Sequence, residues 1–464
     1  MALHDHAARD EGDVVAVRPQ FAQPGETAEV SKLRLPEGEM PADTAYQIVH
    51  DELMLDGNAR LNLATFVTTW MEPQARALIE ESLDKNMIDK DEYPQTAELE
   101  RRCVNMLSAL WGAMDASHGT GCSTTGSSEA CMLGGMALKW RWRARRQAQG
   151  APADRPNLVM GANVQVCWEK FCRYWEVEPR LVPVSAQALH LTADVAAEHC
   201  DENTIGVVAI LGSTFDGSYE PVQEISARLD RLEADTGVHV PIHVDAASGG
   251  FIAPFLDPDV EWDFRLPRVQ SINASGHKYG LVYPGVGWVI WRDHDALPQE
   301  LVFDVDYLGG TMPTFALNFS RPGAQVVAQY YSLLRLGWDG YRRVQQASRD
   351  TAQWLAQEIA DLGAYELLSH GDELPVFAFR IAAPDAGYSV YDVSELIRGR
   401  GWIVPAYTMP PAIDAMAVLR ICVRNGFSRD LAESLLDDLR AVTERLERHG
   451  GIAPPDEARS SFHH

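Results

Sequence analysis

The sequence lacks any long hydrophobic run. No apolar stretch approaches the roughly 20 residues that a membrane-spanning helix needs. The first residues, MALHDHAARDEGD, contain neither the basic nor the apolar region of a secretory signal. We therefore expect no membrane span and a cytoplasmic location.

Cysteine pairs and metal-binding spacings are also missing. The seven cysteines are scattered along the chain and form no CxxC motif and no zinc-finger spacing. An odd number of dispersed cysteines is typical of reduced thiols in a cytoplasmic protein. The sequence therefore predicts neither disulfides nor a metal site.

Positive charge is scarce. Lysine and arginine number 40 against 66 aspartates and glutamates, which gives a net charge of −26. Such an acidic surface disfavours nucleic acid and anionic membranes as partners. Solubility explains most of the acidity, and a bias toward acid conditions is the alternative.

Short apolar runs alternate with helical patterns in the middle of the chain. The runs are NLVM, RLVPV, IGVVAIL, VHVPIHVDA, VQSINAS and VGWVIWR. This alternation predicts an α/β fold with a mostly parallel sheet, in which ligands bind beyond the carboxyl ends of the strands. A long helical run after Gly323 leads to a smaller α+β pattern.

The same patterns predict four parts of the chain. Residues 1–60 form an N-terminal arm that is partly mobile or lies between subunits, 61–347 form the large domain, 348–450 form the small C-terminal domain, and 451–464 form a tail. The beginning of the arm and the tail lack sustained hydrophobic periodicity, so neither is expected to have a core of its own.

A helix start rich in small residues is the first candidate binding site. In GTGCSTTGSSEACMLGG a turn of small residues ends at Gly126, and a helix begins at Ser127 and Ser128. The free N–H groups of a helix N-terminus suit a phosphate. The segment nearly matches a P-loop, but Ser127 stands where the P-loop lysine belongs. A capped, closely packed helix without a ligand is the alternative.

Two charged residues stand at the ends of predicted strands. Asp245 ends a strand in HVDAASGGF, and Lys278 follows another in SINASGHKYG. A lysine among small and apolar residues must shift its pKa or be used covalently, because a buried ammonium is unstable. A phosphate site, a carboxylate and an amine together are what pyridoxal phosphate requires, although each signal is weak alone.

These motifs resemble those of a known enzyme family. HVDAASGGF, SGHKYG, RLNLATF, NMIDKDEYP and FALNFSRP are similar to the pyridoxal phosphate-dependent group II decarboxylases, and most closely to the bacterial glutamate decarboxylases. The resemblance covers most of the chain but is loose over the first 45 residues. It implies a fold-type I large domain, the cofactor pyridoxal 5′-phosphate, and conversion of L-glutamate to 4-aminobutanoate and CO2 with uptake of a proton.

The resemblance also implies which residues bind the cofactor. Lys278 would attach it covalently, Asp245 would keep its ring nitrogen protonated, and His277 would contact its phosphate. The other implied cofactor-binding residues are Ser127, Ser128, Gln165, Thr214, Ala247 and Ser320, the last from the neighbouring subunit. Related aromatic amino acid decarboxylases generally have a histidine in place of Gln165, which favours the glutamate branch.

The implied substrate residues come from other motifs. Arg420 in VLRICVR would grip the α-carboxylate, with an exposed strand arginine as the alternative. The residues implied for the distal carboxylate are Thr65, Phe66, Asn86 and Asp89. Asp89 would face a second carboxylate, which repels it unless one of the two is protonated. We therefore expect binding to strengthen as the pH falls.

The ending SSFHH resembles the tail of bacterial members, in which a C-terminal histidine silences the enzyme near neutral pH. His464 would be that histidine, with a loose terminus or a cloning remnant as the alternative. Nothing after Gly450 resembles the calmodulin-binding tail of plant members. The shared site implies a homodimer at least, with a homohexamer as the larger alternative.

Two other functions stay open at this point. A related decarboxylase could act on another acidic or an aromatic amino acid, although Gln165 and Asp89 argue against aromatic substrates. A catalytically silent assembly protein with the same fold would have no reason to keep Lys278, Asp245 and Arg420 together.

Overall fold

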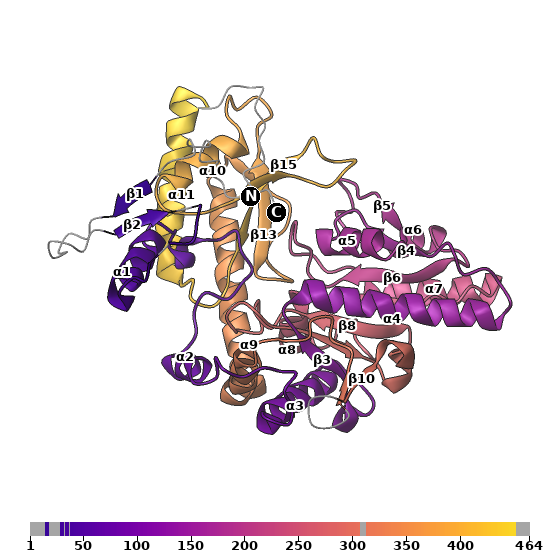
Figure 1. Ribbon diagram of the computed structural model, residues 1–464. Coiled ribbons are helices and arrows are strands. Elements are labelled where there is room, and N and C mark those ends of the chain that lie inside the picture. The colour runs from indigo at the N-terminus through magenta and orange to yellow at the C-terminus, as the bar shows by residue number, and fades with distance from the viewer. Residues whose placement is uncertain (1–13, 18–27, 32, 37, 307–311, 452–464) are drawn as a thin grey trace.

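A seven-stranded sheet forms the centre of the large domain in the computed structural model (Figure 1). The structure describes residues 14–17, 28–31, 33–36, 38–306 and 312–451. The sheet order is β3-β9-β8-β7-β6-β4-β5. Its strands are β3 (Thr120–Thr124), β4 (Asn157–Gly161), β5 (Glu178–Val182), β6 (Thr204–Ile210), β7 (Ile242–Asp245), β8 (Val269–Ala274) and β9 (Gly287–Trp291). Only β9 runs against its neighbours, so the predicted mostly parallel sheet is confirmed.

Helices cover both faces of this sheet because its central strands are apolar on both sides. Val207 and Val208 are both fully buried but belong to different cores, as the alternation of side chains along a strand requires. The core that contains Val208 includes α4 (Ser127–Ala148) and α5 (Val166–Tyr174). The helices of the opposite core are α2 (Pro73–Glu80), α3 (Pro94–Leu110), α6 (Ala193–Glu198), α7 (Val222–Thr236), α8 (Ala253–Leu256) and the first part of α9 (Ala324–Asp361).

A second sheet of four antiparallel strands lies in the C-terminal part, in the order β12-β13-β15-β14. The strands are β12 (Tyr365–Leu367), β13 (Val376–Ile381), β14 (Ala406–Thr408) and β15 (Ala417–Cys422). It shares a separate core with α10 (Val390–Arg398), α11 (Arg429–His449) and the end of α9. Leu63 also packs into this core, so a segment near the predicted start of the large domain contacts the small one. The exact domain boundaries stay predictions.

The long helix α9 differs from the prediction. The sequence predicts one helix ending at Gly337 and another beginning at Thr351, whereas α9 is helical on both sides of a kink at Gly337. The φ of Gly337 is 55°, a left-handed conformation that glycine adopts without strain. The first helix therefore ends as predicted, but the second begins soon after the kink.

The edge strand β3 was also missed, because TGCST contains no apolar run. The sequence predicts a turn of small residues over this stretch. That prediction is wrong up to Thr124, because the chain forms a strand that ends there. A side chain on Gly121 would come within 2.4 Å of the backbone oxygen of Val289 on β9. The close approach of these two strands explains why a small residue stands here.

The remaining strands and the remaining α-helix are peripheral. They are β1 (Val14–Val17) paired with β2 (Ala28–Ser31), helix α1 (Ala42–Leu53), and the pair β10 (Phe303–Val305) and β11 (Met312–Thr314). Within the described residues, no helix has the length and apolar character needed to cross a membrane. His464 lies outside the described residues, and its regulatory role stays a prediction.

Candidate active site

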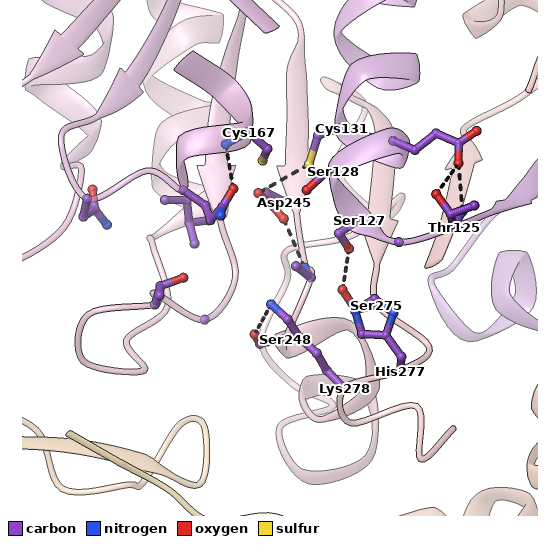
Figure 2. A pocket seen from close by; sticks show the side chains of 18 residues that line it. Thr125, Ser127, Ser128, Cys131, Cys167, Asp245, Ser248, Ser275, His277 and Lys278 are labelled. Carbon is purple, nitrogen blue, oxygen red and sulfur yellow. Dashed lines mark hydrogen bonds between the residues drawn. The ribbon is translucent and has the colours of Figure 1, made fainter. Parts of the chain in front are cut away.

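A cavity of about 330 Å³ lies at the carboxyl ends of the parallel strands, beside the start of α4 (Figure 2). The sequence-predicted residues that line it are Ser127, Ser128, Gln165, Thr214, Asp245, Ala247, His277 and Lys278. Its size and its few convergent polar groups are typical of small-molecule sites. The helix start, the strand-end carboxylate and the lysine therefore meet around one space.

The start of α4 and the loop after β8 form a cradle for an anion. The first N–H groups of a helix have no partner within it, and the Ser127 and Ser275 hydroxyl oxygens lie 2.7 Å apart beside them. Burial, helped by Lys278, lowers the pKa of His277 to about 4. Nδ1 of His277 is buried without a hydrogen-bond partner. An added Cβ on Gly126 would lie 3.0 Å from the His277 ring, which leaves only glycine fitting easily here.

Asp245 is 5% exposed and accepts hydrogen bonds on both of its oxygens. Trp168 Nε1 donates to Oδ2 at 2.8 Å, and the Cys131 thiol lies 3.7 Å from the same oxygen. Asn273 Nδ2 and the Ala247 N–H donate to Oδ1 at 2.9 and 3.1 Å. Four donors around one side chain match the acceptor-only chemistry of a carboxylate.

The Lys278 side chain enters the cavity from the loop after β8. Its Nζ donates to Ser248 Oγ at 3.3 Å and lies 5.1 Å from the centre of the Phe66 ring. Burial lowers the pKa of Lys278, and the Asp245 charge partly opposes this effect. A lowered pKa enlarges the share of neutral amine, which is the nucleophilic form of lysine.

These residues fit pyridoxal phosphate. The unpartnered His277 Nδ1 and the N-terminus of α4 offer donors for a phosphate. A buried carboxylate and an amine with a lowered pKa border the same cavity. Residues 36–382 match the pyridoxal-dependent decarboxylase conserved domain. The chain belongs to this family.

Similar proteins within the decarboxylase family agree with that match. A glutamate decarboxylase of Aliivibrio fischeri is 55% identical over 93% of this chain and 94% of its own length. One of Solanum lycopersicum is 53% identical over 90% of this chain and 83% of its own. The solved structure of Lactobacillus brevis glutamate decarboxylase has a TM-score of 0.89 at 46% identity, over 92% of this chain and 97% of that one. The predicted fold-type I class and the predicted cofactor are thereby confirmed.

Arg420 and Phe66 lie next to the cavity. Arg420 is 5% exposed, so the alternative of an exposed strand arginine is wrong. Its guanidinium donates from Nη1 to the backbone oxygen of Thr214, and from Nη2 to that of Ala64 at 2.6 Å. Its Nε is buried without a partner. The Phe66 ring centre lies 4.8 Å from the guanidinium carbon of Arg420; contact with a substrate carboxylate stays a prediction.

The remaining predicted substrate residues fall into two groups. Thr65 adjoins Phe66, and its hydroxyl accepts from the Val67 N–H at 3.1 Å. Asn86 Nδ2 donates to Asp89 Oδ2 at 2.9 Å and to Ser320 Oγ at 3.3 Å. The described lining of this chain's cavity includes none of Asn86, Asp89 and Ser320. One chain thus brings these three together, but not at its own cofactor cavity.

Several side chains at the cavity were missed by the sequence analysis. Ser248 and Ser275 belong to the motifs DAAS and ASGHK, so their nearness to strand ends was a usable signal. Cys131 and Trp168 contact Asp245 from α4 and α5. Nothing in the sequence places these helices against that carboxylate, because their packing depends on the tertiary fold.

Replacing Arg420 with lysine should destabilise the protein even without ligand. Lysine has a single ammonium in place of the forked guanidinium, so it cannot donate to the backbone oxygens of both Thr214 and Ala64. Loss of one charged, buried hydrogen bond should lower the free energy of unfolding by about 2 kcal/mol, measured by urea denaturation. The exposed Arg440→Lys is the matched control and should change it by less than about 0.5 kcal/mol. Equal stability of both variants would contradict the structural role of Arg420.

Proposed function

We propose that this protein decarboxylates L-glutamate to 4-aminobutanoate and CO2 with pyridoxal phosphate. The observation that carries the proposal is the cavity in which Lys278, Asp245 and the start of α4 meet. It lies in a chain 55% identical to a glutamate decarboxylase over 93% of its length. Gln165 lines this cavity and caps α5, accepting a 2.6 Å hydrogen bond from the Cys167 N–H.

The side chains divide the chemistry among them. When bound, pyridoxal phosphate supplies an electron-accepting ring that stabilises the electron pair left behind by CO2. The start of α4 and His277 would hold the phosphate, Asp245 would accept a hydrogen bond from the protonated ring nitrogen, and Lys278 Nζ would provide the amine for covalent attachment. Hydrogen takes the place of CO2 on the substrate's α-carbon, so each turnover consumes one proton.

A second copy of the chain completes the site in this proposal. Its support is the group formed by Asn86, Asp89 and Ser320. Hydrogen bonds hold these three side chains together, but they lie outside the cavity of their own chain. Placed against a neighbouring subunit, Ser320 would reach the cofactor phosphate and Asp89 the distal carboxylate of the substrate. The minimal active unit is then a homodimer.

All seven cysteines are free thiols, which supports a cytoplasmic location.

A panel of amino acids assayed for CO2 release at pH 4.5 and pH 7 tests the function. We expect release from L-glutamate well above that from aspartate, cysteine sulfinate and aromatic amino acids. Preference for another amino acid would favour the related-decarboxylase alternative. No release from any substrate by protein that carries the cofactor would favour the silent assembly protein.

Asp89→Asn should remove the pH dependence of glutamate binding. Two carboxylates that face each other repel, which weakens binding, and a proton shared between Asp89 and the distal carboxylate at lower pH relieves the repulsion. We expect the KM of the wild type to fall as the pH falls. In the variant, KM at pH 7 should be about tenfold lower, equivalent to roughly 1.4 kcal/mol of repulsion, and nearly flat with pH.

The control for this substitution is Asp91→Asn, on an exposed residue two positions away. It should keep the KM profile of the wild type. An Asp89→Asn profile that follows the wild type would show that Asp89 does not face the substrate.

A further inference from the structure

Four buried polar side chains form a square on neighbouring strands β7 and β8. In the parallel register His243 pairs with Ser271 and Asp245 pairs with Asn273. Residues two apart on a strand share a face, so all four side chains lie on the same side of the sheet. Each is at most 5% exposed. Asp245 borders the cavity. The other three side chains lie behind it, away from the cavity lining: His243, Asn273 and Ser271.

Hydrogen bonds connect these side chains in a row, and each donor points along the row toward Asp245. Asn273 Nδ2 donates to Asp245 Oδ1 at 2.9 Å, so Asn273 Oδ1 must accept on its other side. His243 Nε2 lies 2.7 Å from that oxygen and therefore carries the proton. His243 Nδ1 is then the acceptor for the Ser271 hydroxyl, 2.7 Å away. A single set of proton positions satisfies every member.

The His243 ring is fixed in place by its packing. An added Cβ on Gly134 of α4 would lie 2.5 Å from its Cε1 atom. The Trp168 ring packs edge-on at 5.0 Å between centres, while its Nε1 donates to Asp245. Burial lowers the pKa of His243, which favours the neutral ring that the hydrogen bonds require.

We propose that His243 is a positioning residue for the cofactor: it fixes the Asn273 amide so that Nδ2 faces Asp245, and thereby orients the carboxylate that binds the ring nitrogen. Without the Nε2 proton, Asn273 Oδ1 loses its hydrogen-bond donor, so Asp245 alone holds the amide and its orientation is less fixed. This inference rests on the proposed function, because it assumes that Asp245 meets the nitrogen of bound pyridoxal phosphate. Outer hydrogen-bond partners of this kind typically change ligand affinity by about 10–100-fold at metal sites.

The test compares two cofactors on the full-length apoprotein. Pyridoxal phosphate and its 1-deaza analogue share the phosphate and aldehyde, but the analogue has carbon in place of the ring nitrogen. The ratio of their dissociation constants isolates what Asp245 contributes. His243→Phe keeps a ring of similar size and removes both nitrogens, and His243→Gln can still donate to Asn273. Ser271→Ala is a milder variant that keeps the ring.

We expect His243→Phe to weaken pyridoxal phosphate binding about 10–100-fold and to leave the analogue within about twofold. His243→Gln should recover part of the preference for pyridoxal phosphate over the analogue. Ser271→Ala should lose part of this preference, and it serves as the test variant if His243→Phe does not fold. Equal weakening of both cofactors, or an unchanged ratio in every folded variant, would overturn the inference and leave the proposed function standing. A wild type that binds both cofactors equally would instead overturn the proposed role of Asp245 together with this inference.

Discussion

Lys278→Ala is expected to reduce kcat by about 10³-fold. The variant removes the cavity's lysine amine, whose lowered pKa suits covalent attachment. The wild type should be yellow, and borohydride should fix the cofactor to it permanently. The variant should bind the cofactor only reversibly and release all of it after borohydride and denaturation.

Misfolding would not explain such a loss. A buried ammonium destabilises a fold, so the Lys278→Ala apoprotein should melt at a temperature at least as high as the wild type. Lys139 is a matched control, since it is also partly buried with a lowered pKa but donates to the Trp175 backbone oxygen outside the cavity. Lys139→Ala should keep both colour and activity. A borohydride-stable link in Lys278→Ala would place the attachment elsewhere.

Asp245→Asn should lower kcat by about 10²–10³-fold, the range found when one preorganised electrostatic group is removed. The amide has nearly the same shape but no charge, so the ring nitrogen loses the partner that keeps it protonated. The amide nitrogen would also face at least one of the donors that now serve Asp245, such as Trp168 Nε1 or Asn273 Nδ2. We therefore expect weaker cofactor binding as well, measured by equilibrium dialysis.

Asp263→Asn controls for the loss of a buried carboxylate. Asp263 is 4% exposed and pairs with Arg265 at 2.8 Å, outside the cavity lining. Its variant should lose stability, but kcat of the folded fraction should stay within about twofold of the wild type. A kcat for Asp245→Asn within tenfold of the wild type would contradict an electrostatic role for Asp245.

Sequence patterns predicted the central parallel strands well because these strands are buried and largely apolar on both faces. IGVVAIL and VQSINAS correspond to β6 and β8. The edge strand β3 escaped detection because it is held by backbone pairing with β9 and contains small residues. Backbone hydrogen bonds leave no mark in a hydrophobicity pattern.

The candidate site shows a similar division. Lys278 and Asp245 were visible because charged residues next to apolar runs are unusual. The supporting residues were not visible: Trp168 belongs to an ordinary amphipathic helix, and His243 lies inside an apolar strand. Their roles depend on which strands and helices become neighbours, and a single sequence does not state this.

The guanidinium of Arg420 also has a consequence for the order in which the chain acquires its structure. Its two backbone partners, Thr214 and Ala64, are 206 and 356 positions away in the chain. Contacts over such distances form late, because closing a long loop costs chain entropy before any contact repays it. During synthesis, the hydrogen bonds from Arg420 to Ala64 and Thr214 therefore cannot form until β15 has left the ribosome. The wall of the cavity beside Thr214 is among the last parts of the site to be completed.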